Sequence, residues 1–435
     1  QRPPREFDPN RHRKGEVGMM DQVEALVTWP EEGITRAPYV VYADPEVYAA
    51  EMKRIFRGPI WHYLGLEVEI PARGDYRLMD VGDTSVIVVR NDAGGISALV
   101  NRCAHKGAMV LYKPFGQVNK HLMCVYHNWH YDLDGNLRGV PFAKGIKGKG
   151  GLPDTFCPAD HGLDRLRVET MNGLIFGTFS HEVEPLRDYM GPEMVANIDR
   201  VAGKEFRVLG YYSQWLSSNW KLYVENANDP YHATILHAWA TKLKLNRLTM
   251  DGAIVMGHGG WHHLSWSKMA TDQGGEVYDQ ADMRTGSDAL GGFGLHDPSL
   301  IEQWDEYGDG ITTAIQTAFP NFVLQQIHNT LATRVLVPRG LEGSELIWTI
   351  LGYADDDEQQ TAMRLKQGNL IGPSGYISME DGMIGGLVQR GFQGDLDKAG
   401  VLEMAGRSIE TIEGSRASEC GVRGFWTAYR TLMGV

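Results

Sequence analysis

The chain has 435 residues, 43% of them hydrophobic and 22% charged, which is an ordinary composition for a globular protein and enough chain for two domains. Its net charge of −13 argues against a nucleic-acid-binding protein, because phosphate binding needs a basic face. No apolar run approaches the ~18 residues of a membrane span. Four cysteines are too few for a disulfide framework, so we expect a cytoplasmic protein.

The N-terminal segment begins with polar, basic and proline residues, and we expect residues 1–40 to form an arm. Residues 44–57 predict a helix, because Asp44 suits its N-cap and Gly58 suits its end. Apolar residues recur at helical spacing within it: Val47, Tyr48, Met52, Ile55 and Phe56. We assign residues 41–58 to a helix that packs with the C-terminal domain.

Residues 59–182 have the pattern of a small all-β domain. Short β-rich runs such as TSVIVVRND, SALVNRC and GLIFGTFS alternate with the turn signals NDAGG and DLDGN. The Gly- and Lys-rich residues 143–154 are expected to form a loop within this domain.

Residues 183–435 contain both strand-like and helix-like runs. Strand-like runs are RVLGYYSQWL, FVLQQIHNTLATRVLVP and SELIWTILGYAD, and helix-like runs are WKLYVENANDPYHATILHAW, DDEQQTAMRLKQGNLIG and SMEDGMIGGLVQRGF. An antiparallel sheet with helices packed on one side is the simplest arrangement, so the predicted fold class is α+β.

Residues 101–131 contain two matched pairs, Cys103-x-His105 and Cys124-x-x-His127. Two thiolates and two imidazoles at such spacing indicate a metal site, either structural zinc or a Rieske [2Fe–2S] cluster. Zinc spacings usually pair Cys with Cys and His with His. A Rieske centre takes one Cys and one His from each loop, so the mixed pairs favour the cluster.

A second set of ligand-type residues begins in ENANDPYHATILHAW. His232 and His237 are five residues apart, about 140° around an ideal helix, and the nearby Pro230 is expected to start or bend a helix and so bring them together. Asp229 precedes His232 by one turn and can accept a hydrogen bond from its outer nitrogen. Two histidines and one carboxylate form the facial triad of non-haem Fe(II) sites. The segment GPSGYISMEDGMIGG offers both Glu380 and Asp381, and spacing alone does not choose between them.

Together, the two cysteine–histidine pairs, Asp229-x-x-His232-x4-His237 and a late carboxylate resemble the large (α) subunit of Rieske non-haem iron aromatic-ring-hydroxylating oxygenases. The resemblance covers residues 40–433. It implies that Asp381 is the third iron ligand and that the catalytic domain, residues 183–435, is a curved antiparallel sheet covered by helices, like the START or helix-grip fold.

The same resemblance implies the cofactors and partners: a [2Fe–2S] cluster, Fe(II), O2 as co-substrate, and NADH used through a separate reductase, sometimes with a ferredoxin. Assemblies would be α3 or, with a small β subunit, α3β3, in the bacterial cytoplasm. In such trimers the carboxylate at the position of Asp229 bridges a Rieske histidine of the adjacent chain, here His127, to the ligand His232.

Three segments, DPYHATILH, LIGPSGYISMEDG and GGLVQRGF, look most like those of terephthalate dioxygenases, with salicylate hydroxylases next. The expected reaction is cis-dihydroxylation of an aromatic carboxylate, and salicylate-type monohydroxylation is the alternative. A third possibility is an electron-transfer or zinc-stabilised binding protein. Such a protein would not need the complete set of Asp229, His232, His237 and Asp381.

Recognition of an aromatic acid needs a cation, and Arg390 is the first candidate on resemblance, with Arg334 second. On an unbroken helix Arg390 would lie about 180° from Asp381, so its role requires a break at the nearby glycines. Residues 259–269, as a strand, place three polar side chains on one face: His263, Ser265 and Ser267. Of these, Ser267 is the predicted substrate contact. Two further cysteines, Cys157 and Cys420, are expected to be ordinary small buried residues.

Overall fold

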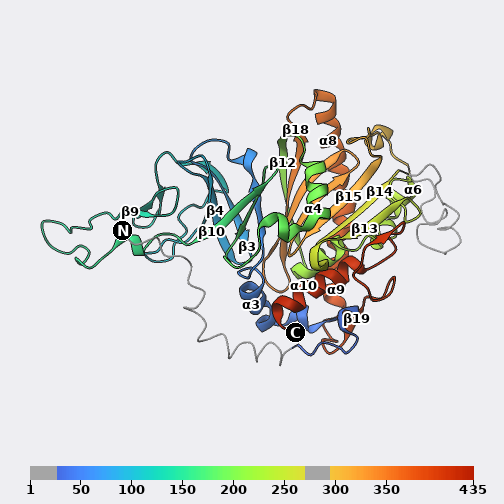
Figure 1. The fold of residues 1–435 in the computed structure, drawn as a ribbon, viewed down its shortest axis with the longest axis horizontal. Helices are drawn as coiled ribbons and strands as arrows, with labels where there is room; N and C mark the ends of the chain where they lie inside the picture. Colours follow the sequence, from blue (N-terminus) through green and yellow to red (C-terminus); the bar gives the residue numbers. More distant parts are fainter. Residues whose placement is uncertain (1–26, 270–293) are drawn as a thin grey trace. The chain divides into compact units, whose positions relative to one another are not determined.

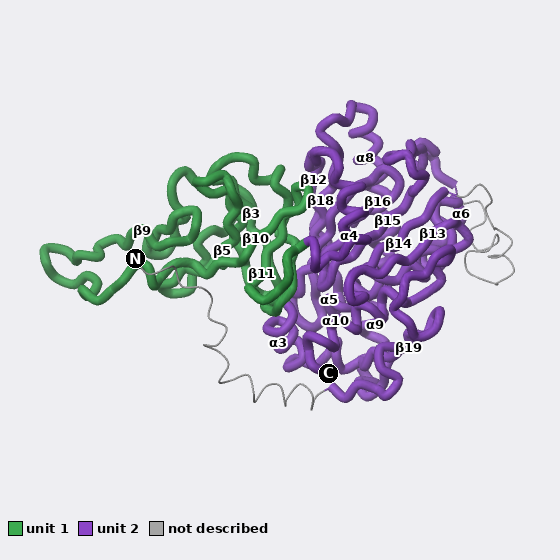
Figure 2. Tube along the Cα trace, in the orientation of Figure 1, with its two compact units in different colours: residues 1–20, 56–186 green, residues 21–55, 187–435 purple. Residues whose placement is uncertain are grey.

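The computed structural model describes residues 27–269 and 294–435, so most of the predicted arm lies outside the described residues. Among the described residues, 56–186 form one compact unit, and the remainder form a second (Figure 2). The boundaries predicted at 59 and 182 lie close to the ends of the first unit.

The first unit is built on a seven-stranded antiparallel sheet in the order β2-β11-β10-β5-β4-β3-β6. Its strands are β2 (His62–Leu66), β3 (Asp75–Val81), β4 (Thr84–Arg90), β5 (Ile96–Val100), β6 (Phe115–Gln117), β10 (Arg165–Met171) and β11 (Leu174–Thr178). The all-β prediction is confirmed for this unit, because the helical segments within residues 59–182 are the short 3-10 turns η4 (Glu67–Glu69) and η5 (Pro158–Asp160).

A second, three-stranded sheet in this unit holds Cys124 and His127 between its first two strands, whereas Cys103 and His105 lie in the loop between β5 and β6. It consists of β7 (Leu122–Met123), β8 (His130–Tyr131) and β9 (Leu137–Gly139). Cys103 and Cys124 are buried in the hydrophobic core beneath it. Residues 143–154 form the expected loop, with a single isolated bridge. Cys157 is exposed, which corrects the prediction that it is buried, whereas Cys420 is buried as expected.

The second unit is built on a curved, eight-stranded antiparallel sheet in the order β12-β18-β17-β16-β15-β14-β13-β20 (Figure 1). Its strands are β12 (Phe206–Leu216), β13 (Gly252–Met256), β14 (His263–Lys268), β15 (Ile311–Ala318), β16 (Phe322–Ile327), β17 (Thr330–Pro338), β18 (Ser344–Tyr353) and β20 (Ile412–Glu413).

Burial along the strands follows their place in this sheet. Every residue of the central strand β17 is buried, as expected for a strand covered on both faces. Strand β12 lies at the edge and alternates between partly buried and exposed residues over most of its length. The predicted strand-like runs in this unit all form strands of the sheet, and the longest one splits into β16 and β17.

The α-helices of the second unit are α2 (Val40–Ala43), α3 (Pro45–Arg54), α4 (Leu186–Val201), α5 (Trp220–Ala227), α6 (Ala238–Lys242), α8 (Glu358–Ile371), α9 (Tyr376–Gly391) and α10 (Cys420–Met433). Helices α5 and α8 pack against β17, and α9 packs against α5 and β12. No helix within residues 27–269 and 294–435 is long and apolar enough to cross a membrane.

Helix α4 corrects the expectation that helices cover only one side of the sheet. Asn197 of α4 donates to Gln316 (2.7 Å), and Arg200 donates to Gln326 (2.8 Å). Successive strand residues point to opposite faces, so these glutamines face away from the side on which Ile315 lies. The sheet therefore has helices on both faces.

The N-terminal part of this unit differs from the prediction at both ends. Residues Arg36–Pro38 form β1, which pairs with β19 (Ala399–Val401), so the predicted arm ends before residue 36. The Asp44 side chain caps α3 as predicted, by accepting from the backbone N–H groups of Glu46 and Val47. The helix ends at Arg54 rather than at Gly58.

Candidate functional site

Two loops of the first unit share one backbone geometry. The N–H of Cys103 and the N–H of Cys124 each donate to the carbonyl five residues ahead, and each cysteine carbonyl accepts from the N–H four residues ahead. The residues at that fourth position, Gly107 (φ 76°) and Asn128 (φ 55°), are both left-handed, a conformation that glycine and asparagine tolerate. The loops therefore present their Cys and His side chains in equivalent ways.

The four candidate ligand side chains of these loops differ in solvent exposure. The thiols of Cys103 and Cys124 are buried, whereas the imidazoles of His105 and His127 are exposed, with ring centroids 4.7 Å apart. The ring of His105 stacks on Trp129 at 4.8 Å, which fixes its orientation. Two buried thiols and two outer imidazoles, one of each from each loop, fit a cluster with one iron held by sulfur and the other by nitrogen.

Tyr131 contacts this donor set from β8. Its hydroxyl lies 3.2 Å from the Sγ of Cys103 and accepts from the N–H of Ala104 (3.1 Å). Burial is the main cause that raises the pKa of Tyr131 well above its ordinary value, so the phenol keeps its proton. The O–H therefore donates to the sulfur of Cys103.

We predict that Tyr131→Phe lowers the reduction potential of the cluster, because a hydrogen bond to a ligand sulfur stabilises the more negative, reduced form. A difference of about 1.4 kcal/mol, typical of a hydrogen bond to a charged group, corresponds to about 60 mV for one electron. Spectroelectrochemical titration of the cluster's visible bands measures this shift, and an unchanged potential would contradict the assigned donor role.

In the second unit, the segment predicted as one helix over residues 220–239 is interrupted. Helix α5 is capped by Asn219 and ends at Ala227, His232 begins the 3-10 turn η6 (His232–Thr234), and His237 is the N-cap residue of α6. This interruption removes the 140° separation of an ideal helix. The two imidazoles lie with ring centroids 5.5 Å apart.

These two histidines converge with Asp381 of α9. The Nε2 atoms of His232 and His237 lie 3.4 and 3.3 Å from the same carboxylate oxygen, Oδ1 of Asp381. The candidate ligand atoms of the three residues all lie within 4.8 Å of one another, as a single ion requires. The histidines come from one broken helical segment and the carboxylate from another helix.

The neighbouring acid has a different position. Glu380 Oε2 lies 2.6 Å from the Nδ1 of His237, on the far side of that ring from Asp381. A carboxylate that accepts from the outer N–H of a ligand histidine fixes its tautomer and orientation. The structure thus brings Asp381 to the metal-facing side of the histidines and Glu380 to the outer side of one of them.

Asn226, near the end of α5, was missed by the sequence analysis. Its Nδ2 lies 3.2 Å from Asp381 Oδ1 and 3.3 Å from His232 Nε2. It therefore touches the same atoms that would bind an ion. Its position in the ENANDPYH segment, one helical turn before Pro230, is the only local signal that marked it.

The electrostatics of these groups suit a divalent cation. Burial opposes a charged imidazole, but the carboxylates of Asp229 and Asp381 outweigh it and raise the pKa of His232 to about 10. Burial would also raise the pKa of Asp381, yet the two imidazoles hold it far below its usual value. In the chain alone, protons supply the positive charge that a metal bound by these atoms would supply instead. The donor set and its charge therefore fit Fe(II).

Asp229 lies beside this set. Its Oδ2 is 3.6 Å from the Nδ1 of His232, longer than a hydrogen bond, and its Oδ1 accepts from the backbone N–H of Tyr231 at 2.9 Å. The predicted neighbour relation between Asp229 and His232 is present in the structure, at a distance that a small rotation of either side chain would close.

A pocket of about 590 Å³, including the part open to solvent, is formed by these residues and the inner face of the sheet. Its metal-site side is lined by Asn226, Asp229, His232, His237 and Asp381. Its other walls are lined by Ser265, Thr313, Ile315, Ile327, Ile377, Arg334 and Arg416, among others. A ring-sized molecule in this pocket would lie directly beside the three ligand residues.

Comparison with protein-family models gives two matches. Residues 60–149 match the Rieske [2Fe-2S] domain, and residues 197–434, more than half of the chain, match the catalytic domain of the ring hydroxylating alpha subunit. The chain belongs to the ring-hydroxylating oxygenase α-subunit family. The resemblance inferred from the motifs is thereby confirmed, and the zinc-stabilised and non-enzymatic alternatives are not supported.

Two curated relatives extend over almost the whole chain. The chain is 46% identical to the terephthalate 1,2-dioxygenase terminal oxygenase component subunit alpha 2 of Comamonas sp, over 94% of this chain and 98% of that protein. It is 44% identical to the anthranilate 1,2-dioxygenase large subunit of Burkholderia cepacia, over 94% of this chain and 96% of that protein.

A solved structure supports the fold. Naphthalene 1,2-dioxygenase from Rhodococcus sp. superposes with a TM-score of 0.75 at 22% identity, covering 98% of both chains. The predicted α+β class, with a Rieske domain and a curved antiparallel catalytic sheet, is confirmed. The two matched domains imply a [2Fe–2S] cluster, a non-haem Fe(II) and O2 as co-substrate.

For this oxygenase α subunit, the structure corrects the candidate substrate residues. Helix α9 continues through Gly385 and Gly386 to Gly391, so Arg390 points away from Asp381. Its side chain is exposed, and its Nε donates to the Gly386 carbonyl. Arg390 is therefore not a pocket residue.

The prediction that Ser267 contacts the substrate is also corrected. Ser265 lines the pocket, whereas Ser267, two residues further along β14, is fully buried beside Thr313 and does not line it. His263, on the same face, is buried near Thr317, 3.5 Å from its hydroxyl, outside the pocket lining.

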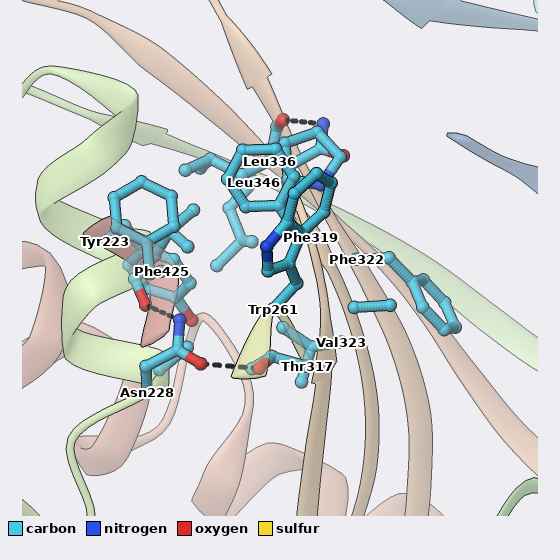
Figure 3. A pocket seen from close by; sticks show the side chains of 15 residues that line it. Tyr223, Asn228, Trp261, Thr317, Phe319, Phe322, Val323, Leu336, Leu346 and Phe425 are labelled. Carbon is cyan, nitrogen blue, oxygen red and sulfur yellow. Dashed lines mark hydrogen bonds between the residues drawn. The ribbon is translucent and has the colours of Figure 1, made fainter. Parts of the chain in front are cut away.

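A second, mainly apolar cavity is shown in Figure 3. It shares the lining residue Ala227 with the first pocket. Its polar wall residues are engaged with one another: Asn228 donates to the Val224 carbonyl at 2.8 Å and accepts from Thr317 at 2.5 Å. Phe319, Phe322 and Phe425 are among its apolar lining residues.

Proposed function

We propose that this α subunit is the terminal oxygenase of an NADH- and O2-dependent system that cis-dihydroxylates an aromatic dicarboxylate of the terephthalate type. The observation that carries the proposal is the presence of two buried guanidinium groups, those of Arg334 and Arg416, in the pocket beside the metal-ligand triad. Arg334 was the second candidate from the sequence, and Arg416 was not foreseen.

Each arginine is held in place by the protein. Arg334 donates through Nη1 to the Tyr223 hydroxyl (2.8 Å), and its guanidinium lies 4.9 Å from the Trp348 ring centroid. Arg416 donates through Nη2 to the Arg247 carbonyl (2.5 Å). Two buried cations that line one pocket favour a ligand of the opposite charge.

The two arginines lie at different strands of the sheet. Arg334 lies on β17, whereas Arg416 lies against β13, where a Cβ built at Gly252 would be 3.1 Å from its Cδ. Four strand spacings, roughly 19 Å along the curved sheet, separate β17 from β13. A ligand with acidic groups at both ends of one ring fits this arrangement better than one with a single acid.

The charges of the lining residues support the same conclusion. Arg334 and Arg416 contribute +2, and the carboxylates of Asp229 and Asp381 contribute −2, so they cancel. A divalent iron in the triad leaves the site with a charge of +2, which a dicarboxylate neutralises. The apolar wall side chains Ile315, Ile327 and Ile377 suit the ring between the two acids.

In this proposal, His232, His237 and Asp381 hold iron, which supplies O2 activation when bound. The residues of the chain act on the substrate: the two arginines fix the ring's orientation, the isoleucines exclude water from it, and Asn226 donates to Asp381. Positioning then decides which ring carbons are attacked.

We predict that Arg334→Met and Arg416→Met each weaken terephthalate binding by about 30- to 1,000-fold, because each removes one partner of a buried, hydrogen-bonded charge pair. Calorimetric titration of the iron-loaded protein with terephthalate, isophthalate, phthalate, benzoate and salicylate measures the effect. Wild type should bind terephthalate best in this panel.

Arg390→Met is the matched control, since Arg390 is exposed and outside the pocket. It should bind terephthalate like wild type. If Arg390→Met lost binding while Arg334→Met kept it, the exposed arginine would be the recognition residue after all. If wild type bound none of the five acids, the proposed substrate class would be wrong.

We further propose the partners that the family resemblance implies: an α3 or α3β3 assembly and a separate reductase, with or without a ferredoxin. Within such an assembly, Asp229 would connect His232 to His127 of a neighbouring copy. The exposure of His127 and the 3.6 Å separation of Asp229 and His232 support this arrangement.

A further inference from the structure

A fully buried glutamine lies on the face of the sheet that points toward the pocket. Gln325 is on β16, where it pairs with Ile315 of β15 on one side and Ala332 of β17 on the other. Ile327, two residues along the same strand, and Arg334, two residues beyond Ala332, point to the same face. Ile315, Ile327 and Arg334 all line the pocket, and Gln325, which is not itself a lining residue, lies next to them on the same face.

The Gln325 amide is unpaired in the part of the chain that the structure describes. Within residues 27–269 and 294–435, neither its Nε2 nor its Oε1 makes a hydrogen bond. The Nε of Arg334 and the Nε1 of Trp348, which continue the same face across β17 and β18, are likewise unpaired among the described residues. Leaving a buried polar group unpaired is costly, so these atoms indicate a partner outside the chain.

The unpaired atoms are mostly hydrogen-bond donors, which indicates the chemistry of the missing partner. Three of the four unpaired atoms are donors: the amide nitrogen of Gln325, Nε of Arg334 and Nε1 of Trp348. A carboxylate has only acceptors, two oxygens with about four lone-pair positions, and can satisfy all three. The remaining Oε1 of Gln325 would then accept from an ordered water.

We propose that Gln325 is a specificity-determining residue that, with Arg334 and Trp348, binds one carboxylate of the aromatic substrate. The inference rests on the proposed function and deepens it, because it distinguishes the end of the pocket at Arg334 from the end at Arg416. At the Arg334 end, three donors bind the carboxylate: the Gln325 amide nitrogen, Nε of Arg334 and Nε1 of Trp348. Gln325 sets the preference for carboxylate over a neutral group.

Two substitutions test the role. Gln325→Met keeps the volume and removes the donor, and we expect kcat/KM for terephthalate to fall about 10- to 100-fold. Its Tm without ligand should be no lower than that of wild type, because an unpaired polar group has been removed. Gln325→Glu replaces the donor with an anion, so terephthalate should bind still more weakly, while preference shifts toward the neutral-ended terephthalamate.

Gln316→Met is the matched control. Gln316 is also a fully buried glutamine of this sheet, but it faces the opposite side and accepts from Asn197. Its replacement should lower Tm and leave the ratio of terephthalate to terephthalamate turnover unchanged. A glutamine with a merely structural role at position 325 would behave in the same way.

The outcomes separate the two proposals. If wild type binds terephthalate and Gln325→Met changes neither affinity nor kcat/KM, the role of Gln325 is overturned and the proposed function stands. An equal loss for terephthalate and terephthalamate would also overturn it. If wild type binds no aromatic acid, both the proposed function and the role of Gln325 are overturned.

Discussion

Asp381→Ala is expected to remove the mononuclear iron and to lower turnover by about 10³-fold or more. The reason is that the carboxylate supplies one of three ligands, and metal assistance contributes several kcal/mol to such reactions. Metal analysis should fall from about three irons per chain, two in the cluster and one mononuclear, to about two. The visible spectrum of the cluster should not change, since Asp381 is in the other compact unit.

Glu380→Gln is the control for this result, because Glu380 is the adjacent acid on the same helix. It contacts the outer nitrogen of His237, so its loss should reduce iron affinity only about 10- to 100-fold. Iron loss in Glu380→Gln with iron retained in Asp381→Ala would mean that the two acids have the reverse roles.

Asp229→Asn is expected to keep about three irons per chain and yet lower turnover about 100-fold. The amide keeps the size of the side chain and removes the charge beside His232, whose Nδ1 lies 3.6 Å from Asp229 Oδ2. If Asp229 connects the two metal sites of neighbouring copies, the reduced cluster should reoxidise slowly when substrate and O2 are added. Stopped-flow absorbance of the cluster bands measures this step separately from product formation.

The outcomes for Asp229→Asn distinguish three roles. Retained iron with slow cluster reoxidation supports the connecting role. Loss of the mononuclear iron would instead make Asp229 an orienting group for His232. Wild-type turnover would show that Asp229 is not needed by the reaction.

The metal-ligand candidates were the most predictable part of the molecule. Cys103, His105, Cys124 and His127 are close in sequence, and the loops that hold them depend on local backbone bonds and on left-handed residues at Gly107 and Asn128. The pair His232 and His237 was recognisable for the same reason, and Pro230 lies in the break between α5 and η6, just before His232.

The choice between Asp381 and Glu380 required the structure. Both acids are on helix α9, and adjacent residues on a helix point about 100° apart. Only the packing of α9 against α5 determines which of them meets the histidines. The resemblance to a family selected Asp381, and the geometry is consistent with that selection.

The substrate residues were the least predictable. Arg390 was the first candidate on resemblance, and its role required the glycines to interrupt α9, whereas the helix continues to Gly391. Arg416 lies in the segment between β20 and α10, with no local pattern that connects it to Arg334. Gln325 gave no signal either, because its meaning comes from its neighbours across β15 and β17. These contacts depend on tertiary pairing between distant segments.

The most direct test of the central claim is a single turnover of the iron-loaded, chemically reduced protein with terephthalate and ¹⁸O2, followed by mass spectrometry of the product. This measurement needs neither the reductase nor the identity of other subunits. The account predicts a cis-dihydrodiol that carries both atoms of one O2 molecule. A product with one labelled hydroxyl would identify a monohydroxylase, and unchanged terephthalate with an oxidised cluster would contradict the proposed substrate.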